Sequence, residues 1–280
     1  MEVIKQEKKA ILVVSFGTSY EETRKLTIEA IEDKVRSQYP DWEVRRAFTS
    51  GKIIKKLKER DNLHVDRVAE ALQRLQDEGY TTVAVQSLHV IPGIEYEEVQ
   101  AEVERFRDNN AFQKIELAYP LLYSMGQEGM SDDFTTLLKA LQEQLPQSIE
   151  DNEAVVLMGH GSPHPTHAFY LVLQYKAEQR GMKNLFFYTV EGAPAIEDVV
   201  EELREKDIQQ VTLMPFMLVA GDHAHNDMAG SEEDSAKSQL EAVGIDVQVY
   251  MRGLGENEAV QKIYLQRLEE AIRHLDSPCV

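Results

Sequence analysis

Three short motifs occur in the same order in each half of the chain, and this repeat restricts the possible folds more than any other feature. Each motif is a strand-like run that ends at a glycine, as expected where a strand gives way to a tight turn. The matched pairs are ILVVSFGTS (11–19) with VVLMGHGSP (155–163), FTSG (48–51) with TVEG (189–192), and VAVQSLHVIPG (83–93) with VTLMPFMLVAG (211–221). The sequence therefore predicts two similar halves.

Strand-like and helix-like segments alternate along both halves. The clearest strand signals are AILVVSF (10–16) and TTVAVQSLHV (81–90), and the clearest helical stretches are 20–38, before Pro40, and a closing helix near 257–275. Strands that alternate with helices form right-handed βαβ units. We therefore predict an α/β fold of two similar doubly wound parallel-sheet lobes. The polar segment 146–153 separates them, which gives lobes at 1–148 and 149–280.

Composition restricts the class of partner. The 280 residues carry a formal net charge of −19, which repels nucleic acids and anionic membranes over long distances. No apolar run approaches the ~20 residues of a membrane span, and the N-terminus lacks the apolar core of a signal peptide. Cys279 is the single cysteine, which excludes internal disulfides and thiolate metal clusters. We expect a cytoplasmic protein whose metal chemistry uses His, Asp or Glu.

The turns that follow the matched strands carry the candidate site. In an open parallel sheet, ligands bind beyond the carboxyl ends of the strands. The residues at the matched positions are Phe16, Ser50 and Glu95 in the first half and His160, Glu191 and His223 in the second. Two imidazoles and one carboxylate with open coordination positions suit a first-row divalent metal, although such a set does not select one metal. The second half is therefore predicted to bind a metal.

Each of these residues also has an ordinary structural interpretation. His160 could cap the helix after GHGS, and Glu191 could be a helix-start carboxylate favoured by the helix dipole. His223 and His225 both lie in AGDHAHND, and the pattern alone leaves either as the ligand. The other histidines are expected at the same strand edge or in a structural role (His89), in the pocket lining or on the surface (His164, His167), and at solvated helix ends (His64, His274).

Residues 44–60 reverse the charge of the chain locally. They carry one acid, Glu59, against Arg45, Arg46, Lys52, Lys55, Lys56, Lys58 and Arg60. This segment is either a solvated helix face or a binding site for a carboxylate-rich ligand, for which the nearby helix N-termini would supply backbone N–H groups.

Several motifs together resemble those of the anaerobic sirohydrochlorin cobalt chelatases of cobalamin biosynthesis. They are SFGTS, AFTSG, QSLHVIPGIEYE, MGHGS, VEG, MLVAGDHAHNDMAG and GLGEN, in order from residue 10 to about 260. The resemblance implies a two-lobed α/β fold related to protoporphyrin ferrochelatase, with the tetrapyrrole in the cleft between the lobes. It also implies catalytic and metal-binding roles for His160, Glu191 and His223, and thereby selects His223 over His225. Segment 161–168 differs in length from the family pattern, so no role is carried over to His164 or His167.

The function that the resemblance implies is the ATP-independent insertion of Co²⁺ into sirohydrochlorin by a lyase. Because the chain contains neither GxxxxGK[ST] nor GxGxxG, no nucleotide is expected. A homo-oligomer is compatible with the sequence. Contacts to the tetrapyrrole are expected from Ser15, Arg45, Arg46, Lys52, His89 and Glu95. The alternatives are insertion of Fe²⁺ or Ni²⁺, a non-catalytic metal or haem carrier, and a periplasmic-type binding protein, which the missing leader disfavours.

Overall fold

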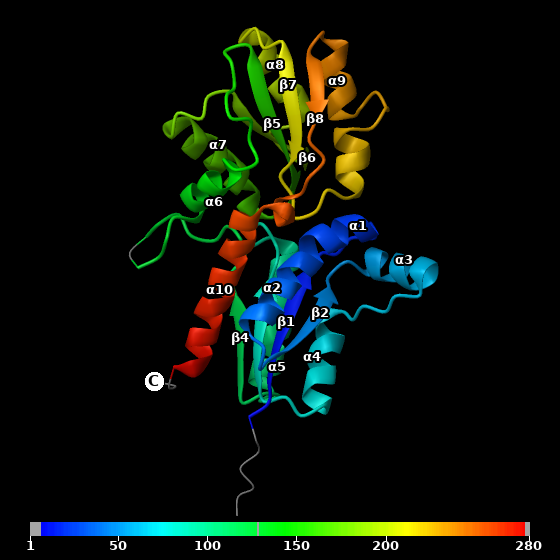
Figure 1. The fold of residues 1–280 in the computed structure, drawn as a ribbon, viewed down its shortest axis with the longest axis vertical. Coiled ribbons are helices and arrows are strands. Elements are labelled where there is room, and N and C mark those ends of the chain that lie inside the picture. The colour runs from blue at the N-terminus through cyan, green and yellow to red at the C-terminus, as the bar shows by residue number, and fades with distance from the viewer. Residues whose placement is uncertain (1–6, 128, 278–280) are drawn as a thin grey trace, which may run out of the picture. The chain divides into compact units, whose positions relative to one another are not determined.

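The computed structural model describes residues 7–127 and 129–277, so Cys279 lies outside the described residues. These residues form two parallel sheets of four strands each (Figure 1). The first sheet has the order β2-β1-β3-β4 and the second the order β6-β5-β7-β8. The strands are β1 (Lys9–Ser15), β2 (Glu43–Phe48), β3 (Thr82–Ser87), β4 (Lys114–Ala118), β5 (Glu153–Gly161), β6 (Leu185–Glu191), β7 (Gln210–Pro215) and β8 (Asp246–Val249).

The two sheets have the same topology, because in each the first strand lies between the second and the third. The predicted fold class of two similar parallel-sheet α/β lobes is therefore confirmed. By contacts, the chain divides into one unit of residues 1–121 with 261–280 and a second unit of residues 122–260. This spatial division differs from the boundary expected after residue 148, which was placed from the polar segment 146–153 and stays a prediction.

Helices cover both faces of the sheet in the first unit. Leu12 on β1, Leu72 on α4 and Val99 on α5 belong to one buried cluster, because alternate residues of the strands face these helices. On the opposite face, Glu32 of α2 binds Arg46 of β2. The helical segments of this unit are α1 (Glu21–Arg24), the π-helical turn η1 (Lys25–Glu29), α2 (Ala30–Gln38), α3 (Gly51–Asp61), α4 (Val68–Asp77), α5 (Ile94–Asp108) and most of α10 (Glu258–Asp276).

The second unit is built in the same way. Val156 on β5, Tyr188 on β6 and Val199 on α8 share a buried cluster, to which Ala224 and Met228 of η3 also belong. Gln174 of α7 accepts a hydrogen bond from the backbone of Phe187. The helical segments are α6 (Asp133–Leu141), the 3₁₀ turn η2 (Pro165–Ala168), α7 (Phe169–Gln179), α8 (Ile196–Glu205), the π-helical turn η3 (Ala224–Met228), α9 (Ala236–Ala242) and the 3₁₀ turn η4 (Leu254–Glu256).

The strand register brings the matched motifs to the carboxyl edge of each sheet. Ser15 pairs with Phe48 in the first sheet, and Gly161 pairs with Glu191 in the second. Gly161 has a φ of +86°, and a Cβ atom there would clash with the carbonyl oxygen of Glu191. Only glycine therefore permits this close approach of the two strand ends. Within the described residues, no helix is long and apolar enough to cross a membrane.

Candidate metal site at the carboxyl edge of the second sheet

His160 lies at the end of β5, one of the two inner strands of the second sheet. β5 ends at Gly161, and His160 is the residue before it. The side chain of His160 is partly exposed. Its side chain leaves the strand on the same face as Val156 and Met158, because side chains alternate along a strand. The Nδ1 atom lies 3.1 Å from the carbonyl oxygen of Gly161. Since a carbonyl oxygen only accepts hydrogen bonds, Nδ1 donates, and in the neutral imidazole Nε2 then carries the lone pair.

His223 lies against His160. It follows β7 and immediately precedes the π-helical turn η3. The two imidazole centroids are 4.8 Å apart, and the rings meet edge to face at 86°. Nδ1 of His223 is 2.8 Å from Oδ2 of Asp227. Single π-helical turns occur frequently at functional sites. The structure therefore brings together the two histidines that the sequence assigned as metal ligands.

Glu191 is not part of this contact. It is the last residue of β6, its side chain is exposed, and it pairs with Gly161 instead of His160. His160 and Glu191 therefore leave their strands on opposite faces. Across residues 7–127 and 129–277, no group of three His, Cys, Asp or Glu side chains is placed to hold one metal ion. Two of the three predicted ligands are adjacent, and the third lies at the end of the neighbouring strand.

His167 connects the two loops that follow β5 and β6. Its Nδ1 accepts a hydrogen bond from the backbone of Ser162 at 3.2 Å, and its Nε2 donates to the carbonyl of Ala193 at 2.6 Å. Gly192 has a φ of +110°, and a Cβ atom there would clash with the His167 ring. His167 thus packs as a structural link beside Glu191. His164 caps η2 by accepting from the backbone of Thr166, and His225 is exposed.

Polar atoms are buried at the carboxyl edge of the first sheet. Among the described residues, Ser15 Oγ, Thr49 Oγ1 and His89 Nε2 are buried without a hydrogen-bond partner. His89 Nδ1 is 2.9 Å from Ser87 Oγ, and burial lowers the pKa of His89 from 6.5 to about 4. The other predicted residues of this edge are Phe16, which is 46% exposed, Ser50, which caps α3, and Glu95, which lies in the first turn of α5.

The basic stretch divides into paired arginines and exposed lysines. Arg45 binds Glu78 through two hydrogen bonds of 2.9 and 2.6 Å, and Arg46 binds the fully buried Glu32 through two of 2.6 and 2.7 Å. Hydrogen bonds to Glu78 and Glu43 raise the pKa of Arg45 further above its ordinary value. By contrast, Lys52 in the first turn of α3 is exposed, and no ion pair to it is found in the described part of the chain.

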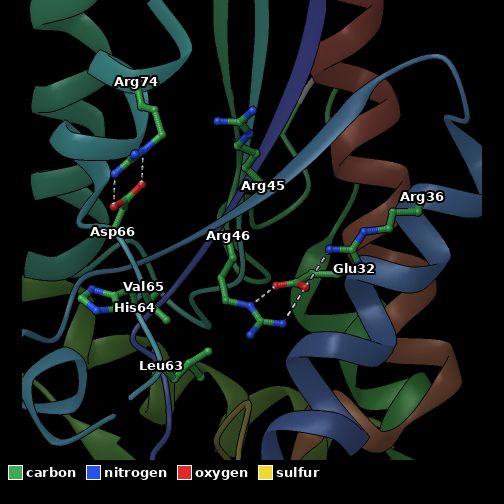
Figure 2. Close-up of a pocket in the computed structure, with 9 residues that line it drawn as sticks. All are labelled: Glu32, Arg36, Arg45, Arg46, Leu63, His64, Val65, Asp66 and Arg74. Atoms are coloured by element: carbon green, nitrogen blue, oxygen red, sulfur yellow. Dashed lines mark hydrogen bonds and ion pairs between the residues drawn. The ribbon is translucent and has the colours of Figure 1, made fainter. Parts of the chain in front are cut away.

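Both arginines line a pocket of about 410 Å³ beside the edge strand β2. Figure 2 shows that Glu32 lies between Arg46 and Arg36 and that Asp66 faces Arg74. The guanidinium groups in this pocket therefore already have carboxylate partners. The lining residues are Glu32, Arg36, Arg45, Arg46, Leu63, His64, Val65, Asp66 and Arg74.

Two residues near the histidine pair were not singled out from the sequence. Asp227 contacts His223, and its signal was the four-residue spacing, which places two side chains on one side of a helical turn. Tyr188 is 3% exposed, and its hydroxyl is buried without a partner among the described residues. Burial and the negative charge of Asp227 raise the pKa of Tyr188. No motif indicated Tyr188, because an aromatic residue in a strand normally signals only a core position.

The fold of the chain is that of the chelatases. SirB from Bacillus subtilis, whose structure was solved with Fe³⁺, superposes with a TM-score of 0.61 at 17% sequence identity, covering 94% of this chain and 95% of that one. This likeness concerns the fold alone.

Sequence comparison gives the family. Residues 9–273 match the family model "Cobalt chelatase (CbiK)". Sirohydrochlorin cobaltochelatase of Salmonella typhimurium is 42% identical over 266 residues, which cover 95% of this chain and 97% of that protein. Sirohydrochlorin cobaltochelatase CbiKC of Nitratidesulfovibrio vulgaris is 36% identical over 269 residues, which cover 96% and 92%. The chain belongs to the cobalt chelatase (CbiK) family.

Proposed function

We propose that the protein inserts Co²⁺ into sirohydrochlorin without a nucleotide, and that His160 and His223 act on the metal substrate. Two curated relatives that match nearly the full length of the chain are named sirohydrochlorin cobaltochelatases. The observation that carries the residue assignment is the contact between the two imidazoles, whose centroids are 4.8 Å apart at the carboxyl edge of the second sheet.

The chemistry of insertion fits an imidazole pair. A metal that enters a four-nitrogen macrocycle must lose water, and the macrocycle must lose two N–H protons. Each imidazole offers Nε2, because Nδ1 is hydrogen-bonded to Gly161 in His160 and to Asp227 in His223. A neutral imidazole nitrogen can bind a first-row divalent metal or accept a proton. Two protein nitrogens leave coordination positions open for the nitrogens of the tetrapyrrole.

Glu191 completes the proposed site. As an exposed carboxylate at the end of β6, it can approach an incoming cation from the opposite face of the strand pair. Its negative charge would offset the positive charge of the metal while the two N–H protons leave the tetrapyrrole. The hydrogen bond from His167 to the carbonyl of Ala193 ties the loop that follows Glu191 to the loop that follows β5.

The proposed substrate contacts lie in the first unit. Ser15 and His89 supply buried polar atoms that lack a partner within the described residues, and such atoms favour a hydrogen-bonding ligand because an unmade hydrogen bond costs about 1–3 kcal/mol. Lys52 supplies a positive charge for a carboxylate of the substrate. Arg45, Arg46 and Glu95 complete the proposed set, although the two arginines already bind carboxylates of the protein.

The test of the residue assignment is a set of single substitutions assayed for cobalt insertion into sirohydrochlorin. We expect His160→Ala and His223→Ala each to lower kcat/KM by at least about 100-fold, as loss of a metal-binding or proton-accepting group does. Both should keep the wild-type circular dichroism, since both side chains are partly exposed. His225→Ala is the matched control, because it removes an exposed imidazole two residues from His223. A large loss in His225→Ala with near-normal His223→Ala would contradict the assignment.

A further inference from the structure

The carboxylate of Asp227 contacts His223 within one turn of helix. Asp227 belongs to η3, four residues after His223, and its Oδ2 lies 2.8 Å from Nδ1 of the imidazole. The two side chains are 48% and 40% exposed. Even an ion pair this exposed adds only about 0.2–1 kcal/mol to the stability of a fold, and a hydrogen bond from a neutral imidazole adds no more. Stability alone therefore gives little reason for the contact.

The contact does determine how the imidazole is presented. An ionised carboxylate only accepts hydrogen bonds, so Nδ1 of His223 is the donor, and in the neutral imidazole Nε2 then holds the lone pair. The hydrogen bond also fixes the orientation of the ring, which meets His160 edge to face. His160 has its own hydrogen bond from Nδ1 to the carbonyl of Gly161. Each histidine of the pair thus has a dedicated acceptor that leaves Nε2 available.

We propose that Asp227 is a positioning residue of the metal site: it holds His223 in the tautomer and orientation in which Nε2 binds the metal substrate. The inference rests on the proposed function, in which His223 acts on Co²⁺. Metal-binding histidines commonly donate their second nitrogen to a carboxylate, and loss of that carboxylate costs about 10–100-fold in metal affinity or activity. In this role Asp227 acts through its contact with His223 and not on the metal or the tetrapyrrole directly.

The matched control is Asp222. It lies next to His223 in the sequence, is exposed, and carries the same charge. Asp222→Asn removes one negative charge beside the site, as Asp227→Ala does, and leaves the contact with Nδ1 intact. A second comparison is Asp227→Asn, whose side-chain carbonyl can accept the same hydrogen bond without the charge. The three variants separate the hydrogen bond from the local charge.

The experiment measures Co²⁺ binding to each full-length variant without tetrapyrrole, by titration of the visible cobalt absorption, and then KM for Co²⁺, KM for sirohydrochlorin and kcat. We expect Asp227→Ala to weaken Co²⁺ binding and raise KM for Co²⁺ by about 10–100-fold, with KM for sirohydrochlorin within about twofold of wild type. Asp227→Asn should recover most of the loss, and Asp222→Asn should resemble wild type.

Wild-type Co²⁺ binding by Asp227→Ala would overturn the inference. So would equal losses in Asp227→Ala, Asp227→Asn and Asp222→Asn, because the effect would then be that of charge. His223→Ala, measured in parallel, separates this failure from that of the proposed function. If His223→Ala is inactive and Asp227→Ala is normal, only the proposed role of Asp227 is contradicted. A fully active His223→Ala contradicts the assignment of His223 in the proposed function.

Discussion

At the scale of single residues, His89 is the clearest case of a side chain whose environment changes its chemistry. Burial lowers its pKa to about 4, whereas an unfolded chain binds the proton near pH 6.5. Between these values the unfolded chain holds a proton that the folded chain does not. The free energy of unfolding therefore keeps the full contribution of neutral His89 above pH 6.5 and loses it as the pH drops toward 4. The contribution is at most about 3 kcal/mol.

The prediction for His89 is a difference in slope. The free energy of unfolding of the wild type should fall more steeply between pH 6.5 and 4.5 than that of His89→Gln, which has no imidazole to protonate. Urea unfolding at several pH values measures both, and the difference cancels the other titrating groups. Parallel curves would show that folding does not lower the pKa of His89.

Arg46 and Lys52 are six residues apart, and the structure predicts different effects when each is replaced: one on stability and one on substrate binding. Within the described residues, Arg46→Ala leaves the buried Glu32 with only the 3.2 Å contact to Arg36, and breaking such a pair costs about 3 kcal/mol. We therefore expect a lower free energy of unfolding. Lys52→Ala should leave stability unchanged and raise KM for sirohydrochlorin, because this exposed lysine has no ion-pair partner within the described residues.

Measuring urea unfolding and KM on both variants decides between the two roles of the basic stretch. An unchanged free energy of unfolding in Arg46→Ala would contradict the structural role of its pair with Glu32, and an unchanged KM would remove Arg46 from the proposed substrate contacts. An unchanged KM in Lys52→Ala would show that Lys52 does not bind the substrate and that this part of α3 is a solvated helix face.

At the scale of elements, the junction of β5 and β6 depends on Gly161. Any side chain there meets the carbonyl of Glu191 and also needs a positive φ. Gly161→Ala should therefore lower both Tm and cobalt insertion. Gly181→Ala is the matched control, because Gly181 also has a positive φ, +72°, but its Cβ would meet no atom within 4 Å.

The comparison separates backbone strain from the clash. Both variants carry the cost of alanine at positive φ, about 1 kcal/mol, and only Gly161→Ala carries the clash as well. Equal Tm values and equal rates for the two would show that the strand ends do not require the close approach at Gly161.

The elements also show what the sequence could predict. The repeat placed the ends of β1, β5 and β6 within two residues of their glycines, because an apolar run followed by glycine is a local pattern, whereas β3 and β7 end six residues before theirs. From the same repeat came the paired positions of His160 and His223. The partners of Arg45 and Arg46 were not predictable in the same way. Glu78 and Glu32 lie 33 and 14 residues away in sequence, so only the fold brings them to β2.

At the scale of the whole molecule, the last helix shows the same limit. The sequence indicated a helix near 257–275, and α10 spans Glu258–Asp276. Its assignment to the first unit depends on distant contacts, among them the hydrogen bond of 3.0 Å from Tyr264 to the carbonyl of Leu88. The helical periodicity of α10 says which residues are buried but not which sheet they cover.

Cobalt insertion by the whole molecule is tested most directly by the rate at which the purified protein forms cobalt-sirohydrochlorin. The measurement follows the change in tetrapyrrole absorption at equal free concentrations of Co²⁺, Fe²⁺ or Ni²⁺, without nucleotide, against the spontaneous rate with each metal. We predict that the wild type accelerates Co²⁺ insertion well above the spontaneous rate, more than it accelerates either of the other metals. The His160→Ala/His223→Ala variant should fall to the spontaneous rate. A wild-type rate with Co²⁺ equal to the spontaneous rate would contradict the proposed cobalt insertion.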